Sequence, residues 1–247
     1  MKISIITATF NSDQTIIDCL NSIFSQTYKN FELIIIDGLS SDNTLKSVSS
    51  FPSNIKILSE LDKGIYDAMN KGIKLATGDV IAILNSDDLF YSNDILDIVA
   101  SKFKIDQSLD IIFGNIVYVN QINTNKIVRK WLSKNIYKNY FEDGNVPPHP
   151  SLFLRRRVYE IAGNFNLDFK LASDYEFMLR IFKKYDFKSL FVNNYFVKMR
   201  LGGATNKSFF NIISQNIEIY SAWKVNNLHP PFYLFPKRFF LRLRQFL

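Results

Sequence analysis

The sequence predicts an α/β fold in which a mainly parallel central sheet is flanked by helices. Short runs rich in apolar and β-branched residues alternate with stretches of helical periodicity through about the first hundred residues. Residues that favour helix N-termini, such as Ser12, Ser41 and Asn93, precede these helical stretches. This alternation is the βαβ pattern that builds parallel sheets.

Each element of this first part follows from its local pattern. Apolar, β-branched runs predict strands over Ile3 to Ile6, Phe31 to Ile36, Ile55 to Leu58, Val80 to Leu84 and Asp110 to Phe113. Apolar residues at helical spacing predict helices over residues 12–25, 42–50, 65–76 and 93–104.

The regular alternation weakens after Gly114. We expect a hairpin over residues 116–131, a proline-containing loop over residues 133–150, and helices over residues 157–162 and 173–184. Gly202-Gly203 is the one place where the chain divides naturally. We therefore expect a main domain over residues 1–204 and a C-terminal helical extension over residues 205–247.

Composition places the chain among globular proteins, because 47% of its 247 residues are hydrophobic and only 21% are charged. Cys19 is the single cysteine and no Cys/His group has zinc spacing, so we expect a reduced, cytoplasmic setting. No apolar run approaches the roughly 18 to 20 residues that cross a bilayer, and the opening run is too short for a signal peptide. The formal charge of +7 suits nucleic acid, anionic lipid or a phosphorylated substrate.

An acidic turn, Asn85-Ser86-Asp87-Asp88, directly follows the apolar run Val80 to Leu84. Two carboxylates at the end of a buried strand are costly to keep ionised, because burial and mutual repulsion both oppose their charge. A cation between them removes that cost, so the turn predicts a metal site. The alternative is a helix N-terminus or a simple turn, since Asn, Ser and Asp are favoured in both.

Two further polar turns follow predicted parallel strands. Thr7-Ala8-Thr9-Phe10-Asn11 ends the first strand, and Asp37-Gly38-Leu39-Ser40-Ser41-Asp42 ends the second. Small residues let a flat ring approach the backbone, and the Asp37 carboxylate can accept a hydrogen bond from a base or a ribose. Ligands bind beyond the carboxyl ends of parallel strands, so the three turns together predict a nucleotide pocket. Turn formation alone would explain each one separately.

Two helix starts carry candidate polar groups. Asp62 and Lys63 precede the helix of residues 65–76, where they either contact a sugar or phosphate or form a solvated helix start. Ser173-Asp174-Tyr175-Glu176 opens an amphipathic helix. Asp174 either favours the helix dipole or acts as a general base at the edge of the pocket.

In these motifs the chain resembles the family 2 glycosyltransferases, particularly bacterial enzymes that build O-antigen or capsule sugars. The resemblance covers residues 1–204 and implies a GT-A fold with a Rossmann-like sheet. It rests on the three turns above together with Asp62-Lys63-Gly64-Ile65-Tyr66-Asp67-Ala68-Met69-Asn70-Lys71-Gly72, His149-Pro150-Ser151 and Ser173-Asp174-Tyr175-Glu176. The order and spacing of these motifs make the match specific.

The resemblance implies a nucleotide-sugar donor, linked to UDP, and a divalent cation, Mn²⁺ or Mg²⁺. Asp37 matches the position that holds the base, Asp87 the last Asp of the DxD motif that meets the metal, and Asp174 the catalytic base. Asp88 and His149 are further metal candidates, although His149 is also explained as a structural loop residue. The remaining donor-site candidates are Thr7, Ala8, Thr9, Asn11, Asp62, Gly64, Asn70, Asn85 and Ser86.

Two departures from the family pattern matter. Asn85 replaces the usual first Asp of DxD and brings no charge to the metal, and Ser173 replaces an acidic residue that often precedes the base. The QxxRW motif of processive synthases is absent, which favours transfer of a single sugar. The implied reaction is an inverting displacement in which Asp174 deprotonates an acceptor hydroxyl, with an undecaprenyl-diphosphate-linked glycan as the expected acceptor.

The C-terminal tail is basic and aromatic. Residues 229–247 hold Lys237, Arg238, Arg242 and Arg244 without an acidic residue. A helix starting near Pro236 would place Phe239, Phe240, Leu243, Phe246 and Leu247 on one face, the pattern of a helix that lies in a membrane interface. Docking of the tail on the protein's own core and an oligomer contact are the alternatives.

Other function classes fit the sequence less well. A nucleotidyltransferase should carry a phosphate loop rich in Gly and Lys or Arg near its start, and none is present. A nucleic-acid-binding module would use the basic tail but would leave the acidic turns unexplained. A scaffold that binds nucleotide without turnover is the third alternative. We therefore expect a metal-dependent glycosyltransferase of the hexosyl or N-acetylhexosaminyl class.

Overall fold

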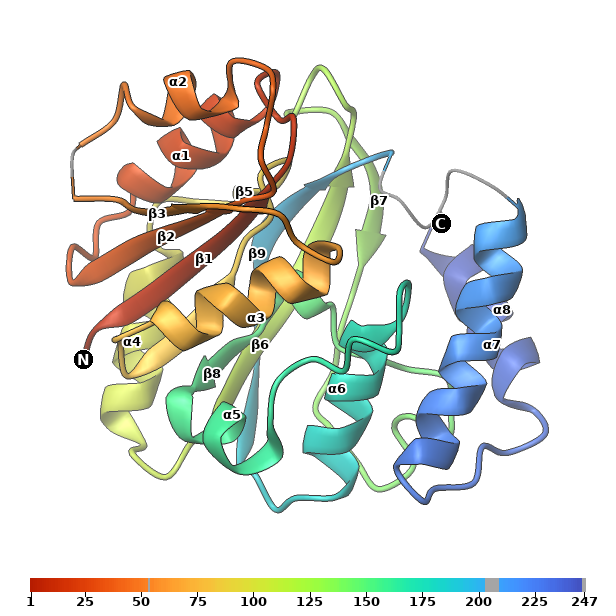
Figure 1. Cartoon of the computed structure of the whole chain (residues 1–247). Coiled ribbons are helices and arrows are strands. Elements are labelled where there is room, and N and C mark those ends of the chain that lie inside the picture. The colour runs from red at the N-terminus through yellow and green to blue at the C-terminus, as the bar shows by residue number, and fades with distance from the viewer. Residues whose placement is uncertain (53, 203–208, 246–247) are drawn as a thin grey trace.

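The computed structural model describes residues 1–52, 54–202 and 209–245. Figure 1 shows a twisted central sheet with helices on both faces and two C-terminal helices packed at one side. The strands are β1 Ile3–Thr9, β2 Phe31–Asp37, β3 Lys56–Ser59, β4 Val80–Ile83, β5 Leu89–Phe90, β6 Ile111–Val119, β7 Ile127–Trp131, β8 Phe153–Arg155 and β9 Ser189–Arg200. The helices are α1 Ile16–Phe24, α2 Thr44–Val48, α3 Ile65–Leu75, α4 Ile95–Ile105, the 3₁₀ turn η1 His149–Ser151, α5 Arg156–Ala162, α6 Ser173–Lys183, α7 Phe209–Val225 and α8 Leu234–Arg244.

The first part of the sheet confirms the predicted βαβ pattern. β1 pairs in parallel with β2 on one side and β4 on the other, and β2 pairs in parallel with β3. Every residue of β1 is buried, because helices cover both faces of a parallel sheet. Alternate residues divide between the two faces, so that Ile6 packs in the cluster that contains α3 and α6, whereas Ile5 packs in the one that contains α1 and α4.

The second part of the sheet is mixed. The strand order among the described residues is β3-β2-β1-β4-β8-β6-β9-β5, with β7 paired to β6. β8 runs antiparallel to β4 and β6, and β9 runs parallel to β6. The predicted hairpin is confirmed as β6 and β7. Strands β5, β8 and β9 were not expected from the sequence, because each is held by a partner distant in the chain rather than by a strong local pattern.

The C-terminal helices pack on the main domain. The Trp223 indole in α7 donates a hydrogen bond of 3.0 Å to the Tyr175 hydroxyl of α6. In α8, Lys237 forms an ion pair of 2.7 Å with Asp143. The expected helix near Pro236 begins at Leu234, and its docking on the core, one of the alternatives above, is found. Phe246 and Leu247 lie outside the described residues, as does the expected domain boundary, so that division stays a prediction.

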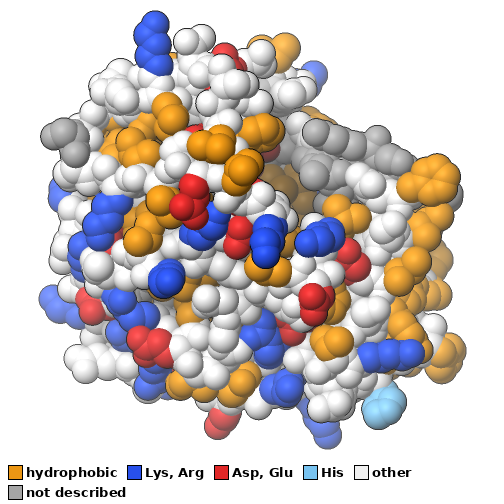
Figure 2. All heavy atoms as spheres, viewed as in Figure 1, with side chains coloured by type: hydrophobic (Ala, Val, Ile, Leu, Met, Phe, Trp, Pro, Cys, Tyr) orange, Lys and Arg blue, Asp and Glu red, His pale blue; other side chains and the backbone are white. Residues whose placement is uncertain are grey.

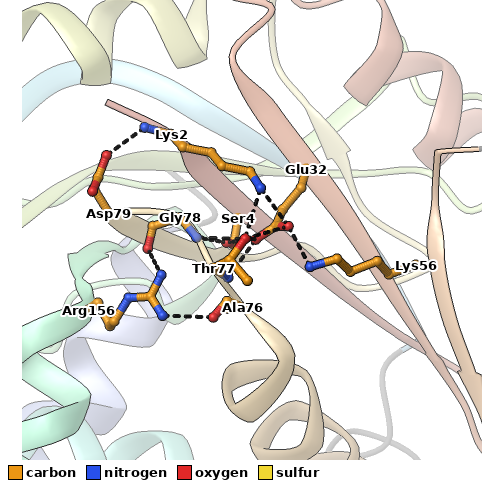
Figure 3. A network of polar contacts seen from close by, with 9 residues as sticks. All are labelled: Lys2, Ser4, Glu32, Lys56, Ala76, Thr77, Gly78, Asp79 and Arg156. Carbon is orange, nitrogen blue, oxygen red and sulfur yellow. Dashed lines mark hydrogen bonds and ion pairs between the residues drawn. The ribbon is translucent and has the colours of Figure 1, made fainter.

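A network of polar contacts joins the strands at the end of the sheet where β1 begins (Figure 3). Glu32 is 8% exposed, and its carboxylate forms ion pairs of 2.9 Å with both Lys2 and Lys56. It also accepts hydrogen bonds from the Ser4 hydroxyl at 2.6 Å and the Thr77 amide at 2.6 Å. These contacts hold the pKa of Glu32 well below its usual range, against the opposing effect of burial. The network therefore couples β1, β2 and β3 to the turn before β4.

Replacing Glu32 by Gln should lower the free energy of unfolding by about 2 kcal/mol at pH 7, because charge-assisted hydrogen bonds are lost in a buried site. Since folding depresses the pKa of Glu32, its contribution is present above the unfolded-state value of about 4.3 and is lost as the pH falls through the folded-state pKa. Urea unfolding at pH 7 and at lower pH measures the difference between parent and variant. A difference that stays constant on acidification would contradict this account.

Candidate active site

The predicted polar turns meet at one edge of the sheet. In the register of the parallel strands Thr9 lies beside Asp37, and the Gly38 amide donates a hydrogen bond of 2.9 Å to the Thr9 carbonyl. β4 pairs with the other side of β1, so the acidic turn follows on the same edge. Figure 2 shows the surface hollowed beside the N-terminal end of α3, on the face where these turns gather in Figure 1.

The turn after β2 is organised around Asp37, whose side chain is completely buried. Its carboxylate accepts hydrogen bonds from the Ser40 hydroxyl at 2.5 Å, the Ser40 amide at 3.1 Å and the Ser59 hydroxyl at 2.6 Å. Asn11 ties this turn to the turn after β1, because its side-chain oxygen accepts a hydrogen bond of 2.9 Å from the Ser41 amide. Its own backbone has a φ of +48°, which Asn tolerates better than most residues. Asp37 thus shapes the turn from within.

Asp62 presents a second carboxylate beside the same turn. A Cβ atom placed on Gly38 would lie 2.6 Å from Asp62 Oδ2, so the carboxylate approaches β2 only because residue 38 has no side chain. Asp62 Oδ1 accepts a hydrogen bond of 2.8 Å from the Gly64 amide. Gly64 has a φ of +114°, a conformation that favours glycine. Glycines at 38 and 64 therefore set the position of Asp62.

The residues under the turns are largely buried. Thr7, Ala8 and Thr9 belong to β1, with Thr7 completely buried and the other two almost so. The Thr9 hydroxyl makes no hydrogen bond to any residue that the structure describes. Ser86 is also buried, and its hydroxyl lies 2.9 Å from that of Ser12. The β1 residues therefore lie buried beneath the turns, where the Thr9 hydroxyl is left without a partner among the described residues.

The acidic turn holds carboxylates that lack sufficient internal partners. Burial raises the pKa of Asp87 and raises that of Asp88 well above its usual range, where the Asp87 charge adds to the effect. Asp88 Oδ1 accepts a weak hydrogen bond of 3.3 Å from the Arg200 amide in β9. Asp88 Oδ2 and the Asn85 side-chain oxygen are buried without a hydrogen-bond partner in the described chain. A nearby cation would satisfy these oxygens and favour the ionised carboxylates.

These oxygens fit a metal that is bound jointly with a substrate. The described residues contain no group of three or more His, Cys, Asp or Glu side chains placed to hold a metal ion. Mg²⁺, however, is usually bound through one or two carboxylates together with the phosphates of its substrate. The Asp87 and Asp88 turn matches that mode of binding rather than a metal site built from the protein alone.

Asp174 lies in the first turn of α6, where it accepts a hydrogen bond of 3.0 Å from the Tyr66 hydroxyl in α3. Burial, together with the charge of Asp174, raises the pKa of Tyr66 well above its usual value. Tyr66 therefore stays protonated and remains a donor, which orients the carboxylate. Because Asp62 and Gly64 directly precede α3, this contact joins Asp174 to the edge that holds the Asp37 turn.

His149 is buried in the turn η1 at the end of the long loop. The His149 and Phe165 rings pack edge to face, with 5.4 Å between their centroids. The His149 imidazole makes no hydrogen bond to any residue that the structure describes. Burial lowers the pKa of His149, although the Asp174 charge acts in the opposite direction. The imidazole is therefore neutral near pH 7, the form that can bind a metal or accept a hydrogen bond.

Asn70 has a structural role in the observed arrangement. Its side chain donates a hydrogen bond of 2.9 Å to the Phe165 carbonyl and accepts one of 3.0 Å from the Phe165 amide. Phe165 in turn packs against the rings of Tyr66 and His149. Asn70 thus fixes the loop that supports both side chains, and the expected contact between Asn70 and the donor stays a prediction.

Four residues outside the predicted set contribute to the site. The Ser59 hydroxyl donates a hydrogen bond to Asp37, and the Tyr66 hydroxyl donates one to Asp174. The Arg200 amide donates one to Asp88, and the Phe165 ring packs between Tyr66 and His149. Tyr66 lies inside a motif that was already recognised, so its position could have been singled out. Nothing in the local sequence marks Ser59, Phe165 or Arg200, because their partners are remote in the chain.

Comparison with known proteins identifies the family. The profile of the family described as Glycosyl transferase family 2 matches residues 4–190. The chain belongs to this family.

Among family relatives, a PGL/p-HBAD biosynthesis glycosyltransferase of Mycobacterium tuberculosis is 33% identical over 188 residues, covering 72% of this chain and 69% of the relative. The Escherichia coli enzyme WfgD is 37% identical over 133 residues, covering 53% of this chain and 51% of WfgD. Its name is UDP-Glc:alpha-D-GlcNAc-diphosphoundecaprenol beta-1,3-glucosyltransferase.

Solved structures of similar fold agree with the family assignment. Staphylococcus aureus TarS, residues 1–349 in complex with UDP-GlcNAc, matches 96% of this chain and 69% of that chain with a TM-score of 0.71 and 18% identity. The Pyrobaculum calidifontis mannosyltransferase PcManGT, in complex with GDP-Man and Mn²⁺, matches 98% of this chain and 74% of that chain with a TM-score of 0.62 and 17% identity. The family 2 chain therefore has the expected GT-A fold, and its class is that of a glycosyltransferase. Within its described residues, no helix combines the length and apolar character needed to span a bilayer.

Proposed function

We propose that this family 2 enzyme is an inverting glycosyltransferase that moves one sugar from a UDP-linked donor to a hydroxyl of a lipid-linked glycan in surface-polysaccharide biosynthesis. The observation that carries the proposal is the hydrogen bond between Asp174 and Tyr66, beside the edge that holds the Asp37 and Asp62 turns. A carboxylate suited to act as a base thus lies next to a crevice suited to a nucleotide. The name of WfgD and the ligands of the TarS and PcManGT complexes support a nucleotide-sugar donor.

The donor is assigned to the turns after β1, β2 and β3. The Asp62 carboxylate lies against Gly38, and we assign it to the base or ribose. The buried Asp37 carboxylate instead holds the turn in shape through its hydrogen bonds to Ser40 and Ser59. Thr9 lies beneath these turns, with its hydroxyl buried and without a hydrogen-bond partner in the described chain. The resemblance gave the base to Asp37 and counted Asp62 among the donor-site candidates; we propose that Asp62 makes the contact to the base or ribose.

Asp87 and Asp88, with Asn85, would hold the divalent cation together with the donor diphosphate. When bound there, Mn²⁺ or Mg²⁺ neutralises negative charge on the leaving nucleoside diphosphate. His149 contributes a neutral nitrogen on the Asp174 side of the site. Asn85 supplies an uncharged oxygen, so the two aspartates carry the electrostatic part of this binding.

Asp174 would accept the proton of the acceptor hydroxyl as its oxygen attacks the anomeric carbon. The bond to the leaving diphosphate breaks on the opposite face, so the anomeric configuration inverts. Tyr66 keeps the carboxylate oriented by donating to Oδ1 and leaves Oδ2 available for the acceptor proton. A positioned base of this kind typically accelerates the reaction about 10²- to 10⁴-fold.

A panel of UDP- and GDP-sugars, assayed for release of nucleotide with Mn²⁺, with Mg²⁺ and with chelator, tests this function. We expect release from a UDP-sugar that is lost with chelator and rises when a glycan acceptor is added. Release that is independent of both metal and acceptor would contradict the proposal. Binding of UDP without turnover of any sugar would favour a nucleotide-binding scaffold instead.

We also propose that the C-terminal helices hold the enzyme on the cytoplasmic face of the membrane. The exposed residues Phe210, Ile213, Ile217 and Tyr220 recur along α7 at the spacing of one helix face. Figure 2 shows apolar side chains gathered along the edge of the molecule formed by these helices. On α8, Phe239, Phe240 and Leu243 are exposed beside Arg242 and Arg244. Apolar residues next to positive charges are typical of helices that bind anionic lipid surfaces.

Replacing both Phe239 and Phe240 by Glu should reduce binding to vesicles containing anionic phospholipid by at least about tenfold. Each buried aromatic side chain contributes about 1.5 to 3 kcal/mol, and the added acids repel the surface. Cosedimentation with vesicles measures the change. Ile105→Asn, which removes an exposed apolar residue at the end of α4, is the matched control and should bind like the parent. Equal binding by all three proteins would remove α8 from membrane attachment.

A further inference from the structure

A cavity of about 850 Å³ lies between the β6–β7 hairpin, the loop before η1, and helices α7 and α8. None of the donor or metal candidates lines it. Figure 1 shows the C-terminal end of α8 beside β7, and the Lys130 amide donates a hydrogen bond of 3.3 Å to the Gln245 carbonyl there. The walls combine aromatic rings and positive charges, namely Tyr118, Trp131, Tyr140, Phe235, Phe239, Arg129, Lys130, Arg238, Arg242 and Arg244. No Asp or Glu of the described chain lines the cavity.

The arginines of this cavity repel one another. Burial lowers the pKa of Arg129 and of Arg238, and the charge of Arg242 acts in the same direction on both. Arg238 Nη1 is buried without a hydrogen-bond partner in the described chain. Arg242 forms no ion pair with any described residue. A bound anion would relieve this repulsion and give Arg238 Nη1 a hydrogen-bond partner.

One residue of the cavity wall, Arg238, packs against α6, the helix that carries the proposed catalytic base. The Arg238 guanidinium lies 4.8 Å from the centre of the Tyr175 ring, and Tyr175 directly follows Asp174 in α6. The Asp174 charge also acts on Arg238, which places the two charged groups within electrostatic reach. A ligand held in the cavity would therefore lie near α6, and none of the donor candidates lines the cavity.

The aromatic lining suits the remainder of such a ligand. The Tyr118 and Trp131 rings are stacked, with an angle of 3° between their planes and 6.4 Å between centroids. The Arg129 guanidinium covers the Tyr118 ring at 3.7 Å. Guanidinium groups match phosphate oxygens in pairs, and flat apolar rings pack against sugar or isoprenoid carbons. Free inorganic phosphate would use the arginines but not the rings.

We propose that this cavity binds the diphosphate of a lipid-linked acceptor, with Arg238 and Arg242 contacting the phosphates. The inference rests on the proposed function and adds to it the acceptor subsite. The exposed apolar residues lie on α8, the same helix that carries the two arginines. The helix that we propose to meet the membrane would therefore also form a wall of the subsite. A diphosphate at the membrane surface would then lie beside Asp174 with its sugar toward the donor.

The test uses geranyl diphosphate as the probe, with geraniol and inorganic pyrophosphate for comparison, and measures binding to the whole protein by titration calorimetry. Geranyl diphosphate should bind more tightly than either comparison ligand. R242Q should weaken it about tenfold or more, since a charge-assisted hydrogen bond is lost, and R242K should weaken it less. R238Q should behave like R242Q. K104Q, which removes a positive charge from α4, is the matched control and should bind like the parent.

Competition separates this subsite from the donor site. UDP with Mn²⁺ should bind the parent and R242Q equally and should not displace geranyl diphosphate. Displacement by UDP, or unchanged binding to R242Q, would overturn the proposal. Arg242 is exposed, so R242Q should fold even if R238Q does not. The proposal would also be overturned if Arg242 were needed for binding to anionic vesicles while geranyl diphosphate did not bind. The arginines would then contact the lipid surface and not a diphosphate in the cavity. Absence of UDP binding by the parent would count against the proposed function and not against this cavity.

Discussion

Asp174→Asn should lower the rate of sugar transfer by about 10²- to 10⁴-fold while leaving donor binding nearly unchanged. Asparagine keeps the size of the side chain and can still accept the hydrogen bond that Tyr66 donates at 3.0 Å. It cannot take a proton from an acceptor hydroxyl near neutral pH. The loss should therefore appear in turnover with acceptor, measured as transferred sugar, and not in the dissociation constant of UDP.

Tyr66→Phe is the companion variant, because it removes the oriented donor without removing the base. We expect a smaller loss than for Asp174→Asn, with donor affinity preserved. If Asp174→Asn transferred sugar at the parental rate, Asp174 would serve only the helix dipole, as the first turn of α6 also allows. If both variants lost donor binding as well, the contact would instead be part of the donor pocket.

Asp87→Ala should weaken metal-dependent binding of the donor by roughly 10²-fold or more, because it removes a charged oxygen from a cation that the protein shares with the diphosphate. Burial raises the pKa of Asp87, and a bound cation would favour its ionised form. The measurement is UDP affinity as a function of Mn²⁺ concentration. In the variant the affinity should become nearly independent of Mn²⁺.

Asp88→Asn gives the matched comparison for Asp87→Ala. Asp88 is more deeply buried and keeps one hydrogen bond to the Arg200 amide, so its change tests whether the second carboxylate also meets the metal. The same Mn²⁺ dependence in Asp87→Ala and in the parent would remove Asp87 from metal binding. The raised pKa values would then reflect burial and the proximity of the two carboxylates, without a metal site.

The sequence was most informative where local pattern and function coincide. The alternation of apolar runs around Ile5, Ile34 and Ile81 with helical stretches predicted a mainly parallel sheet, and in the structure these runs are buried because helices cover both faces. The polar turns after those runs predicted a nucleotide edge, since carboxyl ends of neighbouring parallel strands must lie together. The strand β8 escaped prediction because a three-residue segment carries too little periodicity to distinguish it from a loop.

By itself, then, the sequence determined the class of fold, the family and which aspartates are candidates for chemistry, because these depend on residue type and order along the chain. Only the tertiary structure decided what each candidate touches. It buried Asp37 among Ser40 and Ser59, placed Asp62 against Gly38, and brought Tyr66 to Asp174 across more than a hundred residues of chain. It also packed α8 beside the hairpin, so that the two form walls of a cationic cavity. Such contacts arise from packing between remote segments, and no local pattern encodes them.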